Sequence, residues 1–130
     1  MTINHPSITE EQFVEKYLEF YNLMVPEEQQ LVDSEISLVK EFILLPDDKF
    51  SYQRFGGLAK TKVVESAASK GWKLTKLNIN NKLYALIEKG FLKRDEDSVI
   101  YLPKHILSAA KEFRTSKKFS IHVNFTNGSK

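Results

Sequence analysis

Apolar residues recur at helical spacing in five stretches of the chain. The first follows Thr9, which suits a helix N-cap and has Gln12 three positions later, the spacing of a capping box. Its apolar stripe predicts an N-terminal helix: Phe13, Tyr17, Phe20, Tyr21 and Met24. The later stretches predict helices that run from about residue 33 to 45, from 60 to 69, from Thr75 to Gly90, and onward from Pro103.

Alternating patterns predict strands at three places. Residues 91–94 and 99–102 flank the polar segment 95–98, which predicts a β-hairpin. Residues 50–55 give a weaker strand pattern that ends at a glycine pair. The tail alternates strictly and predicts a half-buried strand, with one side formed by Phe119, Ile121, Val123 and Phe125. Together these elements predict an α+β fold that is mostly helical.

Composition limits the classes of protein. A chain of 130 residues suggests one domain, and 42% hydrophobic with 28% charged residues is a globular balance. The chain has no cysteine, which excludes a disulfide framework, a thiol nucleophile and a cysteine-ligated zinc site. There is no apolar run of about 18 residues and no pattern of a signal peptide, so we expect a cytoplasmic protein without a membrane partner.

Charge is divided unevenly along the chain. Residues 1–50 hold 3 Lys/Arg and 11 Asp/Glu, a net charge of −8, whereas residues 51–130 hold 16 and 6, a net charge of +10. Such a division indicates one part that faces a polyanion and another that faces something else. The alternative is that folding interleaves the two halves and evens out the surface.

Residues 74–102 carry the most specific pattern. The aliphatic positions Ile79, Leu83 and Leu86 precede a polar pair, Gly90 and the apolar pair at 91–92. This pattern resembles the recognition helix and wing of MarR-type winged-helix proteins and their phage relatives, and residues 33–46 look like the first core helix of that family. The resemblance covers roughly residues 31–104 and implies a winged helix-turn-helix, with an extra N-terminal helix and a C-terminal helix plus strand.

The same resemblance suggests an oligomer. In MarR-type proteins the flanking helices usually form a dimer interface, so the arm and helix of residues 1–30 become a candidate interface. The helix and strand-like tail of residues 105–130 give a second one, because a lone strand must pair within the domain or with another chain. The predicted interface residues are Phe13, Tyr17, Phe20, Tyr21, Phe119, Ile121, Val123 and Phe125.

The predicted recognition helix presents amides and lysines to solvent. Asparagine pairs bidentately with adenine, and lysine reaches guanine or phosphate. The predicted DNA contacts are Lys62, Lys73, Lys76, Asn78, Asn80, Asn81, Lys82, Lys93 and Arg94. The alternative is that these are ordinary solvent-facing residues. The acidic tip at 95–97 would be repelled by phosphate, so Lys93 and Arg94, one step back, are the wing residues expected to reach the backbone.

Residues that would support an enzyme are missing from the pattern. The three histidines, His5, His105 and His122, lack metal-ligand spacing, and no glycine-rich phosphate loop is present. We expect no catalytic residue, metal or cofactor. The leading hypothesis is a non-enzymatic protein that binds double-stranded DNA, a small transcriptional or replication-associated regulator of phage or bacterial type. The alternative is an assembly protein, such as a virion component, that uses the winged helix for protein–protein contacts.

Overall fold

The computed structural model describes residues 8–50 and 53–116, and these residues form a mostly helical fold with one small antiparallel sheet. The elements are α1 (Glu10–Leu23), η1 (Glu27–Gln29), α2 (Asp33–Ile43), α3 (Asp47–Phe50), α4 (Gly57–Ser69), α5 (Lys76–Glu88), β1 (Lys93–Arg94), β2 (Ile100–Tyr101) and α6 (Lys104–Ser116). The predicted α+β class is confirmed. Among the helices of this part of the chain, none is long and apolar enough to cross a membrane.

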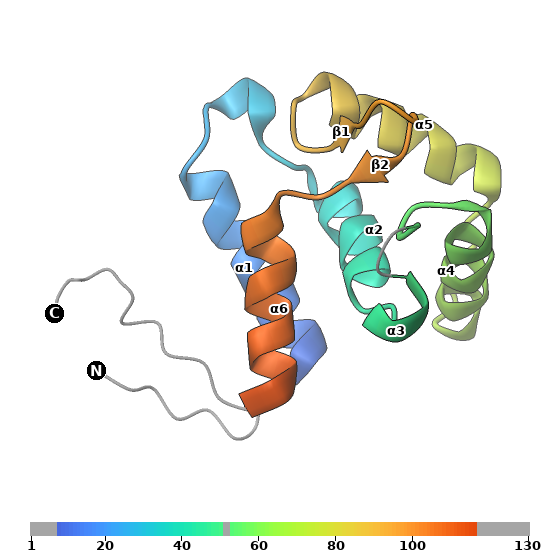
Figure 1. Cartoon of the computed structure of the whole chain (residues 1–130), viewed down its shortest axis with the longest axis horizontal. Helices are drawn as coiled ribbons and strands as arrows, with labels where there is room; N and C mark the ends of the chain where they lie inside the picture. The colour runs from blue at the N-terminus through green and yellow to red at the C-terminus, as the bar shows by residue number, and fades with distance from the viewer. Residues whose placement is uncertain (1–7, 51–52, 117–130) are drawn as a thin grey trace, which may run out of the picture.

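Helix α2 is the central element. Figure 1 shows α1 and α6 side by side on one side of α2, with α4 and α5 on the other. This position follows from its sequence, since Ile36, Val39 and Ile43 bury one side of the helix while Leu38 and Phe42 bury another. A helix that is apolar on most of its surface is stable only when it is surrounded.

One hydrophobic core joins the N-terminal, middle and C-terminal segments. It includes Leu18 of α1, Phe42 of α2 and Leu86 of α5. Phe13 of α1 stacks on Phe113 of α6, with ring centroids 4.6 Å apart and planes 5° from parallel. The flanking helices therefore complete the core of the middle segment.

In the segment predicted as a strand, the described residues 50 and 53–55 form no strand, so for them the prediction was wrong. Its first residue ends α3, and Arg54 and Phe55 lie in a turn. The buried Arg54 guanidinium donates hydrogen bonds to the carbonyl oxygens of Phe42 and Leu45, both at 3.0 Å. Its cation thus adds hydrogen bonds to carbonyls at the C-terminal end of α2, where the helix ladder leaves carbonyl groups available and the helix dipole favours positive charge. Helix α4 begins at Gly57, three residues earlier than predicted.

The predicted hairpin is confirmed, with strands of two residues each. Lys93 pairs with Tyr101 and Arg94 with Ile100. The Asp95 carboxylate accepts the backbone N–H groups of residues 97 and 99 at 2.8 and 3.0 Å, and so stabilises the turn. The strand predicted for the tail lies outside the described residues, with Phe119, Ile121, Val123 and Phe125.

Candidate nucleic-acid interface

Helix α5 is held in place at both ends and along one side. The Thr75 side chain accepts the backbone N–H of Asn78 at 3.1 Å and caps the first turn. Ile79, Leu83 and Leu86 are buried, as predicted. Gly90 adopts φ +85°, a conformation that favours glycine, and turns the chain out of the helix toward β1.

The opposite side of α5 faces solvent. Leu77, Asn81, Tyr84 and Glu88 are exposed and follow one another at spacings of four, three and four residues, so they form one stripe. Asn81 faces solvent, as predicted. The exposure of Leu77 and Tyr84, 68% and 55%, was not predicted. Counting three and four residues in each direction from Asn81 would have found both.

The other predicted α5 residues divide between the two flanks of this stripe. Asn78 is exposed, and its Oδ1 accepts the Thr75 hydroxyl at 2.8 Å. Lys82 is half-buried, and its Nζ donates to Ser34 Oγ of α2 at 2.9 Å. Lys82 thus lies against the protein rather than in the outward stripe. Asn80 lies on the other flank, toward the hairpin.

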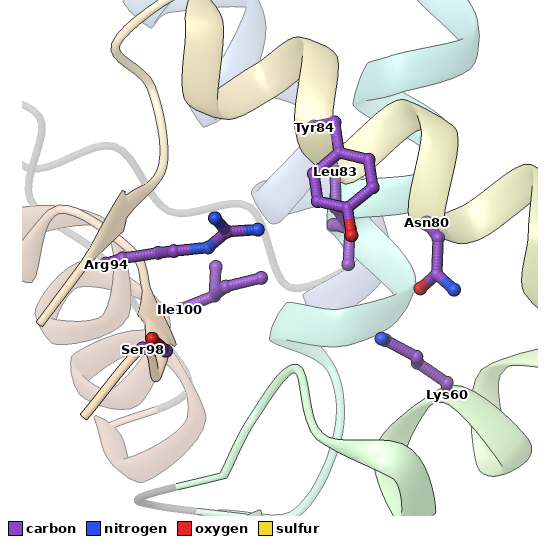
Figure 2. A pocket seen from close by; sticks show the side chains of 7 residues that line it. All are labelled: Lys60, Asn80, Leu83, Tyr84, Arg94, Ser98 and Ile100. Carbon is purple, nitrogen blue, oxygen red and sulfur yellow. The ribbon is translucent and has the colours of Figure 1, made fainter.

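A cavity of about 160 Å³ opens between α4, α5 and the hairpin. Figure 2 shows Lys60 of α4 and Arg94 of β1 reaching toward this space from two sides, with Asn80 and Tyr84 of α5 beside them. The Arg94 guanidinium carbon lies 5.3 Å from the centroid of the Tyr84 ring, a cation–π distance. The remaining lining residues are Leu83, Ser98 and Ile100, so the lining contains two cations and no carboxylate.

The surroundings of Lys60 disfavour its positive charge. Partial burial lowers the pKa of Lys60 below its usual value, and the nearby charge of Lys76 lowers it further. A bound anion would relieve both effects, because an opposite charge stabilises the protonated amine. The cavity therefore has the electrostatic character of an anion site.

Five cations of α4, of the turn before α5, of α5 itself and of β1 make no ion pair within residues 8–50 and 53–116. We call them the basic face: Lys60, Lys73, Lys76, Lys93 and Arg94. Other lysines of these elements are engaged. Lys70 of the α4–α5 turn pairs with Glu41 at 2.6 Å, which raises the pKa of Lys70, and Lys89 pairs with the buried Glu35.

Folding therefore divides the positive charge of the second half of the chain. Part of it is neutralised against the acidic first half, and part remains on the basic face. Lys62, which was predicted to contact DNA, lies 3.9 Å from Glu65 with both side chains exposed. Such a surface pair is weak and leaves the lysine accessible.

The predicted oligomer stripe on α1 is mostly turned inward. Phe13 is only 6% exposed and is buried within its own chain. Its prediction as an interface residue was therefore wrong. The hydroxyl of the half-buried Tyr17 lies 3.1 Å from His105 Nδ1 of α6, and Tyr21 packs edge-on against Phe91 at 5.1 Å. Phe20 alone of the four is exposed. Helical spacing alone could not distinguish the buried from the exposed residues of α1, because α1 and α6 both contribute to the core.

A metal site was also sought among the described residues. They contain no group of three or more His, Cys, Asp and Glu side chains that could hold a metal ion. Comparison with protein-family models, curated proteins and solved structures finds no match for this chain.

Proposed function

We propose that this chain is a DNA-binding protein of the winged helix-turn-helix class, with α5 as the recognition helix and the β1–β2 hairpin as the wing. The observation that carries the proposal is the basic face: five cations of α4, α5, the turn between them and β1 have no ion-pair partner among the described residues, and Lys60 and Arg94 line a cavity beside α5. Cations in such a position neutralise phosphates on both sides of a groove while the helix between them reaches base edges.

The order of elements supports this assignment. Helices α2, α4 and α5 are followed directly by a two-stranded hairpin, and α4 and α5 contact each other and α2. The six-residue turn at 70–75 contains Gly71 at φ +80°, and the Trp72 N–H donates to the Ala67 carbonyl at 2.9 Å. Trp72 itself is half-buried against the core, as expected for a residue that fixes the turn.

Each part of the face has a separate role in this proposal. Asn81, at the centre of the stripe, is placed to read a base edge, with its amide offering a donor and an acceptor. Lys60 and Arg94, on either side of the cavity, each contact a backbone phosphate. The wing tip does not touch DNA, because Asp95 is engaged in the turn and the exposed Glu96 and Asp97 repel phosphate.

The wider role follows the resemblance of residues 31–104 to MarR-type and phage winged-helix proteins. We propose a non-enzymatic regulator of transcription or replication that acts on double-stranded DNA in the cytoplasm of a bacterial or phage-infected cell. The features that bear on this role are the lack of a metal cluster in the described part of the chain and a cavity lined by binding groups rather than an acid–base pair.

The test is fluorescence anisotropy of a labelled mixed-sequence duplex at about 50 mM salt, where nonspecific electrostatic binding is strong. We expect saturable binding by the natural protein and weaker binding by Lys76→Ala/Asn81→Ala. The matched control is Lys104→Ala/Lys111→Ala, which removes two exposed lysines of α6 and should bind as the natural protein does. Absence of binding, or equal losses in both variants, would reject the proposal.

A further inference from the structure

A second exposed surface lies at the end of α1 and the start of α2. Leu23 and Met24 are 80% and 70% exposed, and Phe20 and Val32 are also exposed. Phe20, Leu23 and Met24 share one face of α1 by their spacing. We call these three residues the α1 patch. Large apolar side chains gathered in this way at the surface mark an interaction site.

The patch is held in a defined shape. The Asn22 side chain pairs with both the N–H and the carbonyl of Leu31, each at 2.8 Å, and this fixes the connection between α1 and α2. Gln30 donates a further bond to the Val25 carbonyl at 3.4 Å. A surface that is ordered before binding loses less entropy when a partner docks.

The patch has an acidic rim. Glu27, Glu28 and Asp33 are exposed and make no ion pair within residues 8–50 and 53–116. Glu19 has a weak partner, because its distance to Lys16 is 3.7 Å and both side chains are exposed. The carboxylates nearer the start of α1 differ, because Glu11 and Glu10 pair with Lys40 and Arg114 at 3.1 and 2.5 Å. Uncompensated negative charge is therefore concentrated beside the apolar residues.

The basic face has the complementary composition. It lies beside the exposed apolar side chains Leu77 and Tyr84 of α5, and its cations have no carboxylate partner among the described residues, although Glu88 ends the same stripe. An acid-rimmed apolar surface and a base-rimmed apolar surface attract each other, and the burial of their apolar centres stabilises the contact. Both surfaces belong to the same chain.

The two surfaces do not cover each other within one molecule, because the apolar side chains of both are exposed. Figure 1 shows α1 on one side of α2, and α4 and α5 on the other, all joined by one core. We propose that the α1 patch of one molecule docks on the basic face of a second copy, in a head-to-tail contact. Contacts between two different surfaces of identical chains propagate unless the rotation closes a ring. Duplex DNA would compete for the basic face; this competition, unlike the contact itself, rests on the proposed function.

The test uses two variants that each disable one half of the contact. Leu23→Lys/Met24→Lys places positive charge on the α1 patch, and Lys76→Glu/Arg94→Glu reverses charge on the basic face. By sedimentation velocity from about 1 to 100 µM, a range in which weak contacts become populated, the natural protein should associate and each variant should remain a monomer. An equimolar mixture should form a species of two chains, because each variant retains the half that the other lacks.

Three results would overturn the inference. They are a natural protein that stays monomeric, a basic-face variant that still self-associates through patch-to-patch pairing, and a mixture that stays monomeric. Lys104→Glu/Lys111→Glu on α6 is the matched control for charge reversal and should associate normally. Thermal unfolding of every variant checks that these exposed substitutions leave the fold intact. The α1-patch variant should still bind duplex DNA, so association without DNA binding would reject the proposed function alone.

Discussion

The proposed interface makes a quantitative prediction about salt. Removing the two cavity cations with Lys60→Ala/Arg94→Ala should reduce the number of phosphate contacts of the basic face from five to three. For each contact, the logarithm of the affinity falls by about 0.9 per decade of salt. From about 50 to 200 mM salt, five contacts predict a loss of about 500-fold and three predict a loss of about 40-fold.

The absolute affinities follow from the same relation. Because the counterion contribution vanishes near 1 M salt, the double variant should bind about 200-fold more weakly at 50 mM and about 20-fold more weakly at 200 mM. Both residues are on the surface of the cavity, and no carboxylate lines it, so their loss leaves no buried charge without a partner. The fold should therefore be retained.

The assay is an anisotropy titration of one duplex at four or more salt concentrations, with the slope of log affinity against log salt as the result. Lys104→Ala/Lys111→Ala on α6 removes the same formal charge and should leave the slope unchanged. A double variant with the slope of the natural protein would show that Lys60 and Arg94 do not contact phosphate. Equal changes in both variants would show a diffuse charge effect instead of a site.

Three further predictions concern stability. Phe13→Ala should lower the free energy of unfolding by about 3–5 kcal/mol in a denaturant titration, because it removes a buried aromatic side chain and leaves a cavity; a loss below about 1 kcal/mol would contradict its place in the core. Asn22→Ala should cost about 2 kcal/mol, since two backbone groups of Leu31 lose their partner, and an unchanged melting temperature would count against the tethered connection. The hydrogen bond from Lys40 lowers the pKa of Glu11 in the folded state, so this carboxylate stabilises the fold above its usual pKa and loses that effect as the pH falls through the lowered value. The melting temperature, measured from pH 7 to pH 3, should therefore fall less steeply for Glu11→Gln than for the natural protein. Equal slopes for the two proteins would contradict the assignment.

Helix α5 and the hairpin could be predicted from sequence because their signals are local. A capping threonine, aliphatic residues at helical spacing and a glycine stop determine where α5 begins and ends, and two short apolar segments around a polar turn determine the hairpin. The strand prediction for 50–55 was wrong for the described residues, because Phe50 ends α3 and Phe55 is buried in the turn that contains Arg54. That arrangement depends on carbonyl groups of α2, which are distant in sequence.

The amino-acid sequence alone predicts which residues are cationic and where α5 begins and ends. Which cations have an ion-pair partner depends on the tertiary structure, because folding brings particular carboxylates beside them. Lys70 and Lys89 pair with Glu41 and Glu35 across helix contacts, whereas Lys60 has no carboxylate partner among the described residues. The same holds for α1, where Phe13 and Phe20 have similar sequence signals but differ in burial. The distinction arises from the packing of α6, which covers one side of α1 and leaves the other exposed.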